Sequence, residues 1–133
     1  MCITVAVAVT AAGGTLPLMI VYKGKQNGRI VRDFTDASKG YPAGCSYVCQ
    51  DSAWMDERVM LEWVNDVLKP YVANAPPDIV PLLFLDSYKC HLMSSVVSKI
   101  QDLGIKVQHN PGGCTGLTQP VDMGYNKPLK NRI

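Results

Sequence analysis

A near-continuous apolar run, Ile79 to Leu85, ends abruptly at Asp86. Runs of this length are typical of a strand covered on both faces by helices. Such a strand needs a sheet with helices packed on it, so the run predicts an α/β fold. It also places Asp86 at the carboxyl edge of the sheet, where α/β folds hold their chemistry.

Two apolar segments near the start of the chain predict a β-hairpin. Ile3 to Thr10 and Leu16 to Tyr22 are rich in β-branched residues, and Gly13-Gly14 lies between them. Glycines between two such runs are typical of hairpin turns. From Lys23 to Gln50 the sequence has no sustained period, and we interpret it as a long connection, of a length that is usually functional or mobile.

Two amphipathic helices are predicted in the second half of the chain. Asp56 can cap the first, from Glu57 to about Lys69, and Pro70 is expected to end it. The second runs from Met93 to Leu103, where Gly104 should end it, and a short strand from Ile105 to Gln108 follows.

The order of these elements predicts one domain with a mixed sheet and flanking helices. A length of 133 residues fits a single domain, which can bury roughly two-thirds of its unfolded surface. With 47% hydrophobic residues, 18% charged residues and a net charge of +2, the composition excludes disordered and strongly basic classes.

Cysteine usage and hydropathy indicate an intracellular protein. The five cysteines are an odd number, and the opening Met-Cys-Ile-Thr-Val lacks the charged region of a signal peptide. No apolar run approaches the roughly 20 residues of a membrane span. We therefore expect no membrane partner, and no motif suggests a small-molecule organic cofactor.

A second carboxylate, Asp122, follows Asp86 after a helix and a strand, so the fold can return it to the same edge. Taken alone, Asp86 is open to interpretation as a turn residue and Asp122 as a helix cap. As a pair at one edge, they are candidates for metal ligands. The same end of the chain is basic, because from Leu103 onward Asp122 is the only acid.

Together, these motifs resemble the DDE superfamily endonuclease domain of pogo, Tigger and jerky-type transposases, over essentially the whole chain. The residues that match the family's motifs are Leu82-Leu83-Phe84-Leu85-Asp86 with His91, Asn110-Pro111, Cys114-Thr115, Gln119-Pro120-Val121-Asp122, Gly124 and Pro128-Leu129-Lys130. The hairpin with its Gly-Gly turn, Leu16 to Lys25, and Trp54-Met55 before a helix agree in order and spacing.

The resemblance implies a ribonuclease-H-like fold that binds Mg²⁺ or Mn²⁺ and cleaves DNA or transfers its strands. Asp86 and Asp122 match the second and third acids of the family and are the expected catalytic and metal-binding residues. Carboxylate oxygens are the ligands that Mg²⁺ prefers. A nuclear location and DNA as partner are implied in the same way.

The chain also departs from the family pattern. The family's first Asp lies on a strand before the hairpin, and here no acid precedes Asp33. That strand is the central one of the family's sheet. We therefore expect a partial domain, truncated at both ends and impaired in catalysis, with an open edge beside Val80 to Leu85 that favours self-association. The alternative is a domesticated, non-catalytic module that binds DNA or protein.

Several other residues are candidates for a role in the site or in the core. His91 either orients Asp86 or approaches a phosphate, or it only caps and packs. Gln119 either contacts DNA or fixes the loop before Asp122, and we favour the loop. Lys127, Lys130 and Arg132 are candidate nucleic-acid contacts or a solvated helix face. Trp54 and Trp63 are both expected to be core anchors.

Overall fold

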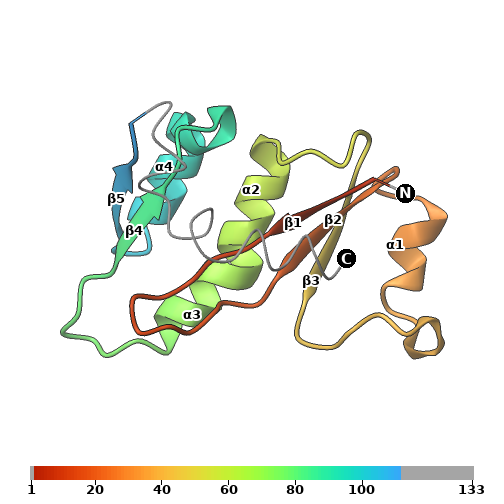
Figure 1. Ribbon diagram of the computed structural model, residues 1–133, viewed down its shortest axis with the longest axis horizontal. Helices are drawn as coiled ribbons and strands as arrows, with labels where there is room; N and C mark the ends of the chain where they lie inside the picture. Colours follow the sequence, from red (N-terminus) through yellow and green to blue (C-terminus); the bar gives the residue numbers. More distant parts are fainter. Residues whose placement is uncertain (1, 112–133) are drawn as a thin grey trace.

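The computed structural model describes residues 2–111 of the chain (Figure 1). Asp122, Gln119, Lys127, Lys130 and Arg132 lie outside the described residues. Across residues 2–111, no helix is long and apolar enough to cross a membrane.

The first half of the chain forms a three-stranded sheet in the order β1-β2-β3. Strands β1 (Ile3–Ala6) and β2 (Met19–Lys23) are antiparallel, with Ile3 opposite Tyr22. Gly13, in the turn between them, has a φ of +87°, which glycine adopts without strain. The predicted hairpin is therefore confirmed.

The stretch from Lys23 to Gln50, predicted to be an irregular connection, contains regular structure. It holds helix α1 (Arg29–Asp33), the 3₁₀ turn η1 (Ala37–Lys39) and strand β3 (Ser46–Gln50). Strand β3 pairs in parallel with β2, with Met19 opposite Ser46. The prediction was wrong because each element is five residues or shorter, too short for an apolar period to appear.

The first predicted helix is present and longer than expected. It begins as α2 (Glu57–Trp63), continues through the π-helical turn η2 (Val64–Leu68) and ends as α3 (Lys69–Ala73). Asp56 caps it as predicted, because its carboxylate accepts a hydrogen bond of 2.9 Å from the Val59 N–H.

Pro70 does not end this helix, contrary to our prediction. It lies at the start of α3, where the missing N–H of proline is tolerated. Immediately before it, the Lys69 N–H donates to the Val64 carbonyl, a wide turn of five residues. The wide turn lets the chain pass proline without breaking the helix.

The second half of the chain forms a separate sheet of two parallel strands, β4 (Leu82–Leu85) and β5 (Lys106–His109). Between them lie the 3₁₀ turn η3 (Lys89–Leu92) and helix α4 (Ser94–Gln101). The chain leaves α4 through Gly104, in the left-handed region with a φ of +79°. The predicted helix and last strand are confirmed, whereas the described residues make two sheets and not the single mixed sheet expected.

Strand β4 is covered on one face only by the described residues. Leu85 is buried, but Leu82 and Phe84 are 53% and 50% exposed. Our expectation of a strand covered on both faces is therefore not met within residues 2–111. Ile79 and Val80, which lead into β4, are also exposed.

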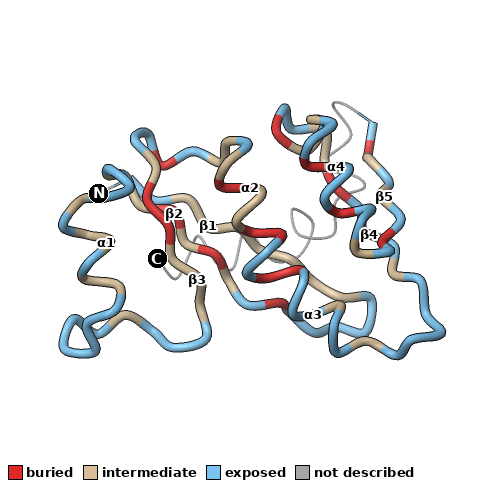
Figure 2. Tube along the Cα trace, turned by 180° about the vertical axis from the view of Figure 1, so that it is seen from behind, coloured by how far each residue is buried: buried red, intermediate tan, exposed pale blue. Residues whose placement is uncertain are grey.

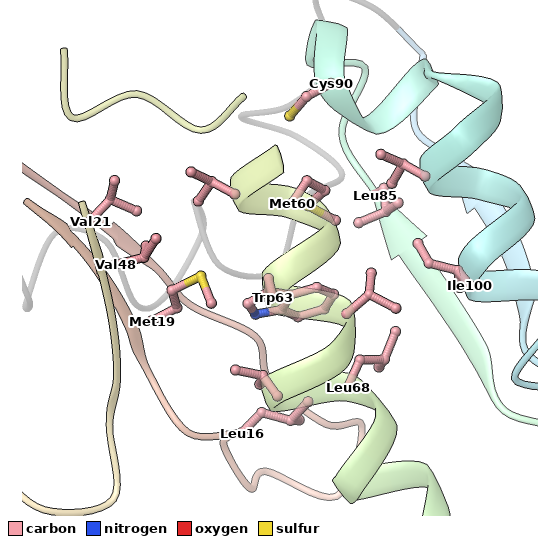
Figure 3. Packing of buried hydrophobic residues seen from close by; sticks show 14 of the residues in the cluster. Leu16, Met19, Val21, Val48, Met60, Trp63, Leu68, Leu85, Cys90 and Ile100 are labelled. Carbon is pink, nitrogen blue, oxygen red and sulfur yellow. The ribbon is translucent and has the colours of Figure 1, made fainter. Parts of the chain in front are cut away.

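The core lies around helix α2, which packs against both sheets (Figures 2 and 3). Trp63 on α2 faces Met19 of β2 on one side, while Leu85 and Ile100 lie on the other (Figure 3). Trp63 is 5% exposed, which confirms it as a core anchor, whereas Trp54 is 64% exposed and is not one. Trp54 belongs to the turn before α2, so its ring falls outside the helix face that meets the core.

Replacing Trp63 with Ala should cost about 3–5 kcal/mol of unfolding free energy, because it removes a buried ring between two sheets. Replacing the exposed Trp54 with Ala, a matched control, should change stability by about 0.5 kcal/mol or less. Chemical denaturation followed by circular dichroism measures both. Equal losses in the two variants would contradict the central position of Trp63.

Cys90, in turn η3, is buried, and this burial raises the pKa of its thiol to about 11. In the unfolded chain a thiol ionises near pH 8.5. Unfolding therefore releases a proton between those values, so stability should fall as pH rises from about 8.5 toward 11. Chemical denaturation measures the free energy of unfolding at pH 7 and at pH 10. The decrease between these two pH values should be smaller in Cys90→Ala than in Cys2→Ala, which removes an exposed thiol. Equal losses would refute the assignment.

Candidate functional site

Asp86 lies at the carboxyl end of β4, as the apolar run predicts. Leu85 and His109 are paired across the parallel strands, and the Asn110 N–H donates a 2.8 Å hydrogen bond to the Leu85 carbonyl. The ladder of hydrogen bonds therefore continues to the last residue before Asp86. The backbone on both sides of the Asp86 position is thereby fixed.

The Asp86 carboxylate is held from one side. Its Oδ1 atom lies 2.6 Å from His91 Nδ1 and accepts a 3.2 Å hydrogen bond from the Tyr88 N–H. Since an ionised carboxylate only accepts, His91 Nδ1 carries the proton in this contact. Within residues 2–111, the second carboxylate oxygen, Oδ2, accepts no hydrogen bond.

The site is partly open to solvent. The side chains of Asp86 and His91 are 32% and 17% exposed. The Asp86 carboxylate is exposed enough to remain accessible to an ion, while the less exposed imidazole of His91 is fixed by its surroundings. The ring of Tyr88 packs edge-on against His91, with centroids 5.8 Å apart.

His109, at the end of β5, supports His91 and was not recognised from the sequence. Its Nε2 atom lies 2.8 Å from the His91 carbonyl oxygen, and because that oxygen only accepts, Nε2 is the donor. This contact joins the end of β5 to turn η3. Its position in the sequence could have identified it, because His109 is the last residue of β5 and Asp86 directly follows β4.

Ser87 provides a second link between the two strand ends. Its hydroxyl donates to the Asn110 carbonyl, and Asn110 is the one buried polar residue among those described. The backbone after β4 is therefore tied to the backbone after β5. In the sequence, Asn110 lies twelve residues before Asp122.

Among the predicted site residues, the structure brings together Asp86 and His91. Asp122, Gln119, Lys127, Lys130 and Arg132 are outside the described part of the chain, so their predicted roles remain predictions. Within residues 2–111, no group of three or more His, Cys, Asp or Glu side chains is arranged to hold a metal ion. Within residues 2–111, Asp86 supplies this site with one oriented carboxylate whose Oδ2 atom accepts no hydrogen bond.

Comparison with known proteins tests the family resemblance directly. The family model described as DDE superfamily endonuclease matches residues 2–133. Among curated proteins, "Pogo transposable element with KRAB domain" from Mus musculus is 28% identical over 98% of this chain, and the Homo sapiens protein of that name is 27% identical over the same share. "Pogo transposable element with ZNF domain" from Homo sapiens is 23% identical over 96% of this chain.

These relatives are much longer than the chain. It spans 20% of the length of the two KRAB-domain proteins and 8% of the ZNF-domain protein. No solved structure matches it. The family match nevertheless covers nearly every residue, and the chain therefore belongs to the DDE superfamily endonuclease family.

Proposed function

We propose that this chain is a transposon-derived DNA endonuclease domain in which Asp86 and Asp122 bind Mg²⁺ or Mn²⁺. The observation that carries the proposal is the state of Asp86. It directly follows β4, one of its oxygens is held by His91 at 2.6 Å, and the other accepts no hydrogen bond within residues 2–111. A carboxylate that is fixed but not saturated is suited to ligating an ion.

The carboxylate of Asp86 fits a hard divalent cation, and a complete metal site needs further oxygen ligands. Mg²⁺ takes oxygen ligands and is commonly held by one or two carboxylates together with substrate phosphates. Asp122 would be the second protein ligand. A bound divalent ion would activate the attacking water or hydroxyl and stabilise the leaving oxygen.

In this proposal His91 is a positioning residue. Its Nδ1–H fixes the Asp86 carboxylate, and His109 holds His91 through the backbone carbonyl. Such outer contacts orient a ligand before an ion arrives, and their removal typically costs 10-fold to 100-fold in affinity or activity. His91 would thus act through Asp86 and not on DNA itself.

We further infer that the two sheets belong to one ribonuclease-H-like sheet that is completed by a strand between β1 and β4. Within the described residues, β1 and β4 each pair on one side only. Helix α2 packs against both sheets, and β1 is the strand of its sheet nearest β4 in the views (Figures 1 and 2). Unpaired edges of this kind favour strand addition or self-association.

Membership of a transposase-related family supports DNA as the partner and the nucleus as the location. The competing function is a non-catalytic module that binds DNA or protein through the same scaffold. Within these 133 residues, two carboxylates, Asp86 and Asp122, match acids of the family's three. We therefore expect this stretch of chain, assayed by itself, to cleave DNA slowly.

The cleavage proposal is tested by nicking of supercoiled DNA with the 133-residue chain and Mg²⁺. We expect slow nicking that EDTA abolishes, a loss of about 100-fold or more in Asp86→Asn, and a loss of about 10-fold in His91→Ala. Asp78→Asn, which changes an exposed acid, is the control and should keep the wild-type rate. Nicking that persists unchanged in Asp86→Asn would overturn the assignment.

Metal binding separates the endonuclease from the non-catalytic module. An ion that binds only the folded chain raises its melting temperature by mass action. We expect millimolar Mg²⁺ to raise the melting temperature of the wild-type chain, and the increase to vanish in Asp86→Asn and Asp122→Asn. The absence of any Mg²⁺ effect on wild type would favour the non-catalytic module.

A further inference from the structure

The segment from Lys23 to Lys39 concentrates positive charge on one exposed part of the molecule. Its five cations are Lys23, Lys25, Arg29, Arg32 and Lys39, all exposed. They are half of the lysines and arginines within residues 2–111. Only two acids, Asp33 and Asp36, fall in the same segment.

Among residues 2–111, none of these cations forms an ion pair with a neighbouring side chain. In the described part of the chain, ion pairs join Arg58 to Glu62 and Asp86 to His91, and no others occur. The Oδ1 atom of Asp36 accepts hydrogen bonds of 2.9 and 2.7 Å from the backbone and hydroxyl of Ser38, and this carboxylate forms no ion pair within residues 2–111. At the β2 end of the segment, Lys23 is paired with Gln50 of β3, and Asp51 is the next residue of the chain.

The segment is fixed to the sheet by a cluster of four aromatic rings. Tyr22, Phe34, Tyr41 and Tyr47 all contact one another, with ring centroids 5.3 to 6.5 Å apart. Phe34 comes directly after α1, and the Tyr47 hydroxyl donates a 2.6 Å hydrogen bond to the Pro42 carbonyl. The cations therefore project from an anchored segment, which reduces the entropy lost when they bind a partner.

The arrangement of the cations fits a polymer that carries regularly spaced negative charges. Arg29 and Arg32 are three residues apart on α1, so they leave the same side of that helix. The aromatic rings pack against one another and so do not form separate platforms for stacked bases. Contacts to phosphates, without reading of bases, are what such a surface offers.

We propose that the segment Lys23–Lys39, which we name the α1 basic surface, is a second contact for the phosphate backbone of double-stranded DNA, separate from Asp86. The two lie at opposite ends of the molecule, with α1 beyond β3 and the β4–β5 sheet on the other side of α2 (Figures 1 and 2). The proposal rests on the proposed function, because it takes DNA as the partner. It assigns part of the affinity to a surface that contributes nothing to cleavage chemistry.

The test measures binding of a fluorescently labelled 30-base-pair duplex to the 133-residue chain, by anisotropy in EDTA so that no metal is involved. Arg29→Glu together with Arg32→Glu should weaken binding by about 10-fold or more and lower the slope of log affinity against log salt by about 2. The matched control, Lys69→Glu with Lys99→Glu, makes the same change in charge at two exposed cations elsewhere and should retain most of the affinity.

The outcomes separate this inference from the proposed function. Unchanged binding in Arg29→Glu/Arg32→Glu, or an equal loss in the control pair, would overturn the α1 basic surface and leave the nicking result standing. Absence of binding by the wild-type chain would overturn both. Binding to phosphatidylserine vesicles but not to DNA, sensitive to the same arginines, would overturn DNA as the partner. Should the double Glu variant fail to melt cooperatively, Arg29→Gln/Arg32→Gln replaces it, with a smaller loss expected.

Discussion

The burial of helix α2 between two sheets is the interaction on which the rest of the structure depends. Met19 and Val21 of β2 and Val48 of β3 pack on one side of α2, and Leu85 and Ile100 pack on the other (Figure 3). The aromatic cluster of Tyr22, Phe34, Tyr41 and Tyr47 also packs on the three-stranded sheet, and α4 packs on β5. Since a sheet of two or three strands is marginal by itself, each depends on such packing, and α2 is the element that contacts both sheets.

This arrangement explains how a carboxylate can be held in place on a small two-stranded sheet. Leu85 is buried against the core, and the next residue is Asp86. Cys90, Val96 and Ile100, from η3 and α4, are buried with it. The turn that carries His91 is therefore fixed by packing beneath it, and the hydrogen bonds among Asp86, His91 and His109 are formed between elements that are already in place.

What the sequence predicts depends on how long each pattern is. The helix that starts after Asp56 and the helix before Gly104 repeat apolar residues over several turns, so their existence was predictable. Strand β3 is five residues long and is recognised only through its partner β2, which is information that a single sequence does not contain. Pro70 misled the prediction because proline ends a regular helix but is accommodated after the wide turn at Val64–Leu68.

The candidate site likewise contains residues that could be predicted from the sequence and residues that could not. Asp86 was predictable, because an apolar strand ending in a carboxylate fixes both its place and its accessibility. The sequence left three interpretations of His91 open, and its 2.6 Å contact with Asp86 favours the orienting one. His109 was not predictable, since its contact is with a backbone carbonyl contributed by η3. The exposure of Trp54 was likewise hidden, because it depends on where α2 begins relative to the core.

Two parts of the fold are built from segments that lie close together in the sequence, which has a consequence for how the protein folds. The hairpin β1–β2 and the β4–α4–β5 unit each join segments close in sequence, and α2 lies between them both in sequence and in position. Loop-closure entropy is therefore small for each unit. Each unit can gain its local contacts early, and docking on α2 becomes the step that commits the chain to its native state.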